Sequence, residues 1–307
     1  MNHRIAVLVL LGLLLAGCSP SSPKDAVADR SSPSPSASEG NGPLVPPLPS
    51  LSASTAPSSR PTRSVVPERV FGADVSWPQC PKGMGIPEKR SEGAPMPTAA
   101  AEFVILGLTN GPSFVANPCL ADQVRWVAER HLLGAAYAVV SYPDQGTLRR
   151  YGARGPFPGR TRLGALSNVG YNAAVFNLAT MRSAGLRSPV VWVDVEPVPK
   201  FEWTADLRAN AAVVRGVVRG YGDAGFPVGF YSTPSLWQRV VGDLRFGLPE
   251  WRAAGQTSQQ EALSRCGPDW SFQGGPGVFG QWVEAGRDRN VTCPGTSVGS
   301  GRWFHRY

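Results

Sequence analysis

The fold depends most on one stretch, Val190-Val191-Trp192-Val193-Asp194-Val195-Glu196-Pro197. An apolar run rich in β-branched residues that ends at a proline predicts a buried strand. Side chains alternate along a strand, so Asp194 and Glu196 are expected on one face. Removing two carboxyl groups from water is costly. This pattern therefore indicates a metal, a basic partner or acid/base chemistry.

Predicted strands and helices alternate on both sides of this stretch. Further strands are predicted at 70–76, 103–109, 134–141, 227–232, 249–253 and 278–283, and near 288–292. Helices are predicted after Asn117-Pro118, from an Asn168 cap to Gly185, at 204–224 and at 235–241. A long loop is predicted at 142–166, with Arg149, Arg150, Arg154, Arg160 and Arg162. The alternation predicts an α/β fold with a parallel sheet, closed into a single (β/α)8-type TIM-like barrel.

Carboxyl groups gather at the predicted strand ends, where such barrels carry their chemistry. They belong to Asp74, Asp194, Glu196 and Asp288. Glycoside hydrolysis needs one protonated acid and a second group that stabilises the positive transition state or activates water. We expect Glu196 to be the general acid, its pKa raised by burial and by Asp194, while Asp194 and Asp74 stay ionised. The alternative is a buried salt bridge, or carboxylates that cap neighbouring loops.

Several motifs together resemble family 25 glycoside hydrolases, the Chalaropsis-type lysozymes. The motifs are Gly72-Ala73-Asp74-Val75-Ser76-Trp77-Pro78-Gln79, Val193-Asp194-Val195-Glu196, Gly229-Phe230-Tyr231-Ser232, Pro249-Glu250-Trp251 and Gln281-Trp282. The resemblance implies cleavage between N-acetylmuramic acid and N-acetylglucosamine, with Glu196 as general acid, Asp194 and Asp74 as partner acids, and Asp288 in a D-x-N/D element. The chain is also similar to glycoside-hydrolase-like domains of actinobacterial secreted lipoproteins. That similarity implies the alternative of an inactive, glycan-binding lipoprotein.

Aromatic residues near the predicted strand ends are candidates for sugar binding. Sugars have apolar faces on which aromatic rings can stack, although packing in the barrel is the more common fate of an aromatic. The predicted substrate-binding residues are Trp77, Tyr231, Trp251, Gln281 and Trp282.

The cysteine and charge content narrows the class of protein. An even number of cysteines in an exported domain implies disulfides. Of three possible pairings, Cys80–Cys119 and Cys266–Cys293 are favoured because each would link neighbouring loops. Histidine and cysteine spacing fits no zinc pattern, so no metal or other cofactor is expected.

The net charge of +8 favours an anionic wall polymer or a membrane surface over nucleic acid as partner, unless arginine merely reflects a high-GC genome.

The N-terminal residues predict export. A basic start and a short apolar run end in Leu15-Ala16-Gly17-Cys18, which resembles a bacterial lipobox. We therefore expect a signal peptide at 1–17, a lipidated Cys18 that begins a Pro/Ser-rich disordered tether at 18–67, and a barrel domain at 68–307. These features predict a monomeric, lipid-anchored cell-envelope protein at the outer face of the cytoplasmic membrane, acting on peptidoglycan.

Overall fold

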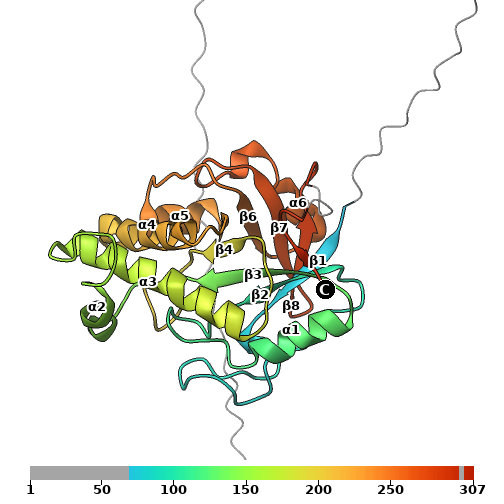
Figure 1. The fold of residues 1–307 in the computed structure, drawn as a ribbon. Coiled ribbons are helices and arrows are strands. Elements are labelled where there is room, and N and C mark those ends of the chain that lie inside the picture. Colours follow the sequence, from blue (N-terminus) through green and yellow to red (C-terminus); the bar gives the residue numbers. More distant parts are fainter. Residues whose placement is uncertain (1–68, 297–300) are drawn as a thin grey trace, which may run out of the picture. The chain divides into compact units, whose positions relative to one another are not determined.

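Eight strands form a closed barrel in the computed structural model, which describes residues 69–296 and 301–307 (Figure 1). The predicted signal peptide, the lipidated Cys18 and the tether at 18–67 lie outside the described residues. The strands are β1 (Phe71–Val75), β2 (Phe103–Gly107), β3 (Leu133–Val139), β4 (Val191–Asp194), β5 (Val228–Ser232), β6 (Glu250–Gln256), β7 (Gly277–Glu284) and β8 (Arg287–Thr292). Each strand pairs with its neighbours in the chain, and β1 pairs with β8, which closes the ring. The predicted TIM-like α/β barrel is confirmed.

One strand runs against the expected direction. Strands β1 to β7 are parallel, but β8 is antiparallel to both β7 and β1. The turn between β7 and β8 has only two residues, Ala285 and Gly286, and both have positive φ, 51° and 69°. This is the backbone of a two-residue hairpin turn, which reverses the chain without a crossover helix. Consequently the amino end of β8, and not its carboxyl end, lies beside the carboxyl ends of the other strands.

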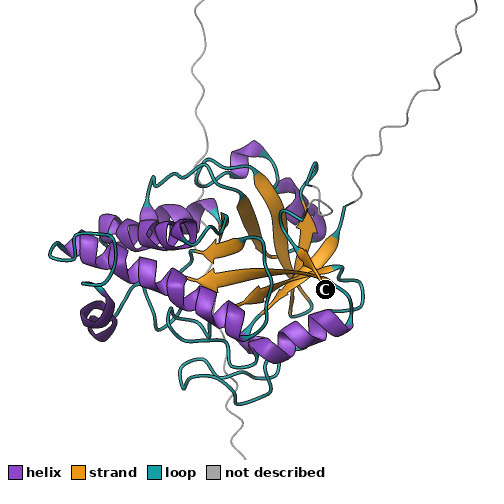
Figure 2. Ribbon diagram, viewed as in Figure 1, coloured by secondary structure: helices purple, strands orange, loops and turns teal. Residues whose placement is uncertain are grey.

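The helices lie outside the barrel (Figure 2). They are α1 (Leu120–Glu129), α2 (Gln145–Tyr151), α3 (Arg162–Ser183), α4 (Leu207–Asp223), α5 (Pro234–Val241) and α6 (Gln259–Ser264), with 3-10 turns η1 (Trp77–Gln79) and η2 (Pro268–Trp270). The longest two, α3 and α4, lie side by side in Figure 1. Backbones approach closely there, because a methyl group on Gly170 or Gly216 would collide with the carbonyl of Val213 or Ser167 on the other helix.

The predicted loop at 142–166 is wrong, because it contains α2 and the start of α3. Thr161, and not Asn168, caps α3, and its side chain accepts a hydrogen bond from the Gly164 amide. Asn168 lies inside the helix, where its amide nitrogen donates to the carbonyls of Gly152 and Phe157. It therefore fastens the α2–α3 connection. The end of α3 is as predicted, since Gly185 follows it with φ 71°.

An aromatic core fills the barrel interior. Trp192 packs against Trp251, Phe279 and Trp303, with ring centroids 5.1–6.2 Å apart. Trp303 and Phe304 come from the C-terminal segment, whose short strand β9 (His305–Arg306) pairs with the beginning of β3. This segment closes the end of the barrel where the parallel strands begin. A second, aliphatic core lies between the outer faces of the strands and the helices.

Both favoured disulfides are confirmed. Cys80–Cys119 joins the segment after η1 to the start of α1, and Cys266–Cys293 joins the segment after α6 to the end of β8. Each bond links segments that leave or approach the barrel rim. The disulfides therefore restrict the connections around the strands.

An ion pair is buried on the outer side of β6. Arg252 Nε lies 2.8 Å from Glu250 Oε2, and the two side chains are 2% and 0% exposed. Arg252 also donates to the carbonyls of Arg265 and Gly267, while Glu250 accepts from the amides of Phe272, Gln273 and Gly275 among others. This pair fixes the whole connection between α6 and β7.

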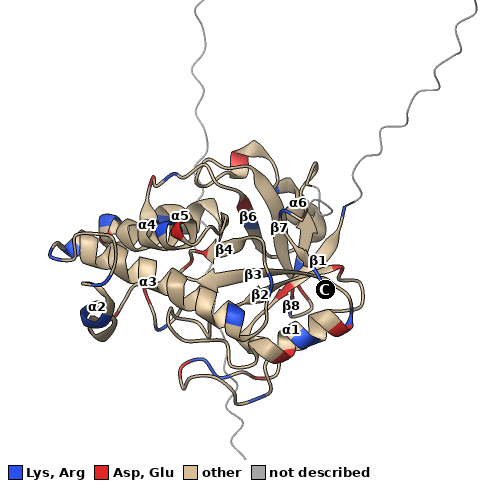
Figure 3. Ribbon diagram, viewed as in Figure 1, with Lys and Arg blue, Asp and Glu red and all other residues tan. Residues whose placement is uncertain are grey.

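Charged residues are distributed widely over the described part of the chain. In the view of Figure 3, Lys and Arg lie on several helices and loops and are not gathered in one patch. No helix among the described residues has the length and apolar character needed to cross a membrane.

Candidate active site

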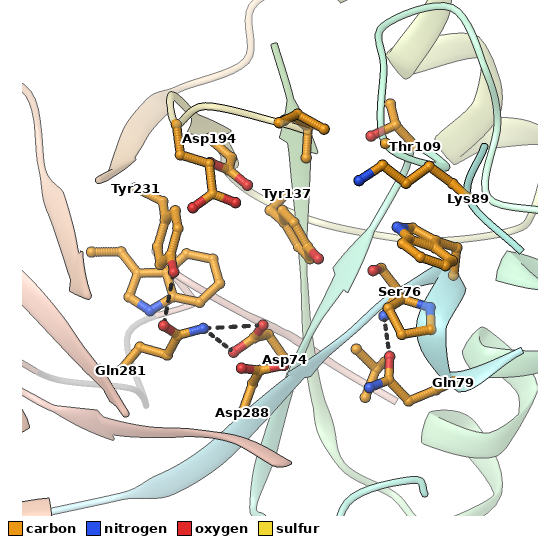
Figure 4. A pocket seen from close by; sticks show the side chains of 18 of the residues that line it. Asp74, Ser76, Gln79, Lys89, Thr109, Tyr137, Asp194, Tyr231, Gln281 and Asp288 are labelled. Atoms are coloured by element: carbon orange, nitrogen blue, oxygen red, sulfur yellow. Dashed lines mark hydrogen bonds between the residues drawn. The ribbon is translucent and has the colours of Figure 1, made fainter. Parts of the chain in front are cut away.

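A cleft of about 240 Å³ lies at the edge of the barrel where the parallel strands end. Four carboxyl groups line it, those of Asp74, Asp194, Glu196 and Asp288. The sequence expectation that these residues meet therefore agrees with the structure. Figure 4 shows Asp74 and Asp288 next to each other, with Asp194 facing them from β4.

Strand alternation places the carboxyl groups inside the barrel. On β1, Asp74 points inward while its neighbour Val75 packs in the aliphatic outer core. Asp194 is the last residue of β4, and Glu196 follows two residues later on the same side. The Trp203 indole donates to the Glu196 carbonyl at 2.9 Å, which holds the chain in place beyond the strand.

Asp288 lies at the amino end of its strand, and not at the carboxyl end as expected. It lies near the amino end of the antiparallel β8, opposite Val283 of β7. Because β1 pairs with β8 through Ala73 and Arg289, Asp74 and Asp288 come from adjacent strands. The hairpin thus supplies an acid at the same rim as the parallel strands.

Two hydrogen-bonded chains hold Asp74. In the first, Trp251 Nε1 donates to Asn290 Oδ1 at 2.7 Å, and Asn290 Nδ2 donates to Asp74 Oδ1 at 2.7 Å. An indole N–H can only donate. The Asn290 oxygen must therefore face Trp251, and its NH₂ group must face Asp74.

In the second chain, the Tyr231 hydroxyl donates to Gln281 Oε1 at 2.8 Å, and Gln281 Nε2 donates to Asp74 at 3.2 Å (Figure 4). Asp74 therefore receives N–H donors from two amides. Such donors favour the ionised form of a carboxyl group.

Asp194 has the opposite environment. It is 3% exposed, and its Oδ1 atom has no hydrogen-bond partner among the described residues. Burial raises the pKa of Asp194 well above its usual value, and the charges of Glu196 and Asp74 raise it further. Burial followed by the charge of Asp288 also raises the pKa of Asp74, although Asn290 and Gln281 oppose that shift. That both aspartates stay ionised remains a prediction: burial acts against the charge on each, and Asp74, with its two amide donors, is the better placed of the two to carry one.

Glu196 has a pKa close to neutral pH. Burial raises its pKa to about 7, and the charge of Asp288 adds to the shift, while Lys89 opposes it. The direction agrees with the prediction for a general acid. The charge that raises the pKa of Glu196 is that of Asp288, while the interaction between Asp194 and Glu196 raises the pKa of Asp194. Burial also raises the pKa of Asp288 itself.

The predicted sugar-binding residues separate into two groups. Trp77, Tyr231, Trp251 and Gln281 line the cleft. Trp282 does not, because it follows Gln281 on β7 and points to the other face, where it packs with Ala262 and Val291. It is 3% exposed, so the expectation that Trp282 contacts a glycan is corrected. Side chains alternate along a strand, so the sequence alone could have excluded Trp282 once Gln281 was placed in the cleft.

Two residues that line the cleft carried no motif in the sequence, Lys89 and Tyr137. Asn290 is the last residue of the D-x-N/D element, but its bond to Asp74 was not predicted. None of the arginines of the 142–166 segment is among the described residues that line it. Within residues 69–296 and 301–307, no three His, Cys, Asp or Glu side chains are grouped as ligands of a metal ion would be.

The chain has structural likenesses among solved proteins. A family GH25 lysozyme from Aspergillus fumigatus matches with a TM-score of 0.46 and 17% identity, over 76% of this chain and 98% of that one. A muramidase from Acremonium alcalophilum matches with a TM-score of 0.47 and 15% identity, over 76% and 97% of the two chains. The modular autolysin LytC from Streptococcus pneumoniae matches with a TM-score of 0.43 and 14% identity over 73% of this chain, which spans only 46% of LytC.

Comparison of the sequence alone gives no relatives. No protein-family model matches it, and no curated protein matches it. The fold assignment accordingly rests on the strand pairing in this structure, and the functional argument rests on the residues of the cleft.

Proposed function

We propose that this protein is a glycoside hydrolase of the bacterial cell envelope that cleaves the glycan strands of peptidoglycan as an N-acetylmuramidase. One observation carries the proposal: Glu196, with a pKa of about 7, shares a single cleft with Asp74, Asp194 and Asp288. Acid-catalysed cleavage of a glycosidic bond needs a carboxyl group that is protonated at working pH beside one that is charged. The sequence motifs that resemble family 25 glycoside hydrolases support the choice of glycan.

In the proposed mechanism, Glu196 donates its proton to the glycosidic oxygen as the C–O bond breaks. Positive charge then develops on the sugar ring, and Asp74, fixed by Asn290 and Gln281, stabilises it electrostatically. Water adds to the anomeric carbon, and its proton returns the carboxyl group of Glu196 to the acid form. No cofactor is required for these steps.

Asp194 is proposed to position the substrate. Its buried Oδ1 atom has no partner among the described residues although the side chain lines the cleft. A buried polar atom without a partner is costly. A polar group of the sugar, such as an acetamido group, would supply that partner on binding.

Digestion of purified peptidoglycan tests the activity. The protein is expected to release fragments with new reducing ends at N-acetylmuramic acid, identified by mass spectrometry. Fragments with reducing ends at N-acetylglucosamine would contradict the bond assignment. Binding to wall preparations without any release of fragments would instead establish the inactive, glycan-binding alternative.

We also propose that the protein is exported and anchored by lipid on Cys18, so that the barrel works at the outer face of the cytoplasmic membrane. The apolar run and the Leu15-Ala16-Gly17-Cys18 sequence support this. Cell fractionation tests it: a Cys18→Ser variant should leave the membrane fraction, and an unchanged distribution would refute the anchor.

The rate of hydrolysis should decline on the alkaline side of neutrality. Glu196 must be protonated to act, and its pKa is about 7, so the active form is lost as pH rises through that value. Each further pH unit should then cost about tenfold in kcat/KM. Because the cleft acids are easier to ionise in the unfolded chain than in the barrel, the free energy of unfolding should also fall as pH rises toward 7. A rate that keeps increasing above pH 8 would contradict the assignment.

The first hydrogen-bonded chain predicts a positioning role for Trp251. In a Trp251→Phe variant, Asn290 loses its indole donor partner and is no longer held toward Asp74. We expect kcat to fall about tenfold with little change in KM, since one buried hydrogen bond is worth about 1 kcal/mol or somewhat more. The acidic limb of the pH–rate profile should also move to higher pH, because Asp74 loses a donor that favours its charge.

Trp192→Phe is the matched control for this prediction. Trp192 packs against Trp251 in the same core, but its Nε1 atom has no hydrogen-bond partner among the described residues. The control should lose some stability and keep its pH profile. An equal shift in both variants would show that ring volume, and not the hydrogen bond, matters.

A further inference from the structure

Lys89 has a fixed position in the wall of the cleft. Its backbone carbonyl accepts a hydrogen bond from Asn110 Nδ2 at 3.1 Å, and its amide donates to the Ile86 carbonyl at 3.0 Å. Asn110 is fully buried and also accepts from the Ile86 amide, at 2.8 Å. The aliphatic part of Lys89 runs along Gly111, where a methyl group would come within 3.1 Å of its Cγ atom. The loop is therefore built to hold this side chain.

The ammonium group of Lys89 points into the cleft (Figure 4). It lies 6.0 Å from the centre of the Trp77 ring, one of the candidate sugar-stacking surfaces. Lys89 forms none of the ion pairs found among the described residues. A half-buried ammonium beside an aromatic ring, without a carboxylate in contact, can form a charge-assisted hydrogen bond with an anion.

The surroundings of Lys89 include charges of both signs. Burial lowers the pKa of Lys89, and the charge of Lys200 lowers it further, while Glu196 and Glu202 act against that shift. Lys200 has a backbone φ of 72°, unusual for a residue other than glycine, and its amide is bonded to the Glu202 carboxylate at 2.9 Å. The backbone of Lys200 is thus fixed, and its exposed side chain carries a second positive charge that acts on Lys89.

We propose that Lys89 binds an anionic group, a carboxylate or a phosphate, carried by the glycan next to the bond that is cleaved, with Lys200 strengthening the attraction. This specificity rests on the proposed hydrolysis of a glycan in the same cleft. An anion site at Lys89 would make the enzyme prefer glycan strands whose sugars carry an anionic group to glycan strands that are neutral.

Binding measurements on the full chain test the inference without interference from turnover. A Glu196→Gln background prevents cleavage, and it also removes any effect of Lys89 on the general acid. Three probes are compared by calorimetry: glycan chains stripped of peptide with free carboxylates, the same chains with the carboxylates amidated, and amidated chains that carry a phosphate ester. The first and third probes distinguish the two sources of the anion.

Lys89→Gln should weaken binding of an anionic chain by about 10- to 100-fold. Binding of the amidated chain without phosphate should be unaffected. Lys89→Arg should retain the preference for the anion. Lys82→Gln is the matched control, since Lys82 lies in the same loop but is paired with Glu92 at the surface, 3.6 Å away. The preference should also weaken as ionic strength rises.

Equal loss of affinity for charged and amidated chains would overturn the inference, as would an effect of Lys82→Gln equal to that of Lys89→Gln. The outcome is separable from the proposed hydrolysis. Cleavage by the wild-type protein with no dependence on Lys89 refutes the anion site alone. Anion binding that depends on Lys89, without any cleavage by the wild-type protein, refutes the hydrolase alone.

Discussion

A Glu196→Gln variant is expected to hydrolyse peptidoglycan about 10²- to 10⁴-fold more slowly than the wild-type protein, the range typical for loss of a general acid. Gln keeps the shape of the side chain and can donate a hydrogen bond, but it cannot transfer a proton to the glycosidic oxygen. The measurement is the rate of appearance of reducing ends. A substrate whose leaving group needs no protonation, such as an activated aryl glycoside, should recover much of the lost rate.

The same variant should not be less stable than the wild type. The raised pKa of Glu196 means that its ionised form is disfavoured in the barrel. Removing that ionisation should therefore leave stability unchanged well below pH 4.5, the ordinary pKa of the side chain, and increase it at pH 8. Glu129→Gln, on the outer helix α1, is the control for loss of a carboxyl group at the surface. Wild-type activity in Glu196→Gln would remove Glu196 from the mechanism.

An Arg252→Met variant is expected to unfold with about 3–5 kcal/mol less free energy than the wild type. The change leaves the Glu250 carboxylate buried without its guanidinium, and it frees the carbonyls that Arg252 holds between α6 and β7. Urea denaturation of the purified protein measures this loss. Activity at low temperature should change much less, because neither residue lines the cleft.

Two further variants make the stability prediction specific. Arg219→Met breaks an exposed pair with Asp223 and should cost less than about 1 kcal/mol. Glu250→Gln combined with Arg252→Met removes both charges and should recover part of the loss. If Arg252→Met costs no more than Arg219→Met, the buried pair does not hold this side of the barrel.

Strand positions and the rim that carries the carboxyl groups were predictable because they depend on local pattern. The apolar run before Asp194 predicted β4, and the period of two placed Asp194 and Glu196 on one face. The direction of β8 was not predictable in this way, since alternation is the same for parallel and antiparallel strands. Only the turn at Ala285 and Gly286 carries that information. The prediction that Asp288 lies with the other acids was therefore right. The expectation that β8 runs parallel to its neighbours, on which that prediction rested, was wrong.

The predicted helix boundaries were wrong where a polar residue could either cap a helix or hold a neighbouring segment. Asn168 and Thr161 are both good helix caps by residue type. Tertiary packing decided between them, because Asn168 is needed inside α3 to hold the α2–α3 connection. Lys89, and the role of Asn290 within the D-x-N/D element, were missed for a related reason. Their roles depend on contacts with Asn110, Trp251 and Asp74, which are distant in sequence.

Trp303 and Phe304 close the end of the barrel where the parallel strands begin, and this affects how the chain folds. These rings pack on Phe103, Phe279 and Trp192, so the interior joins residues about 200 positions apart. During synthesis the earlier strands are made first, and their apolar inner faces remain exposed until the C-terminal segment follows. Folding of this protein is therefore expected to be slow and to finish only after synthesis, with a partly open barrel as the species most exposed to proteases and most in need of chaperones.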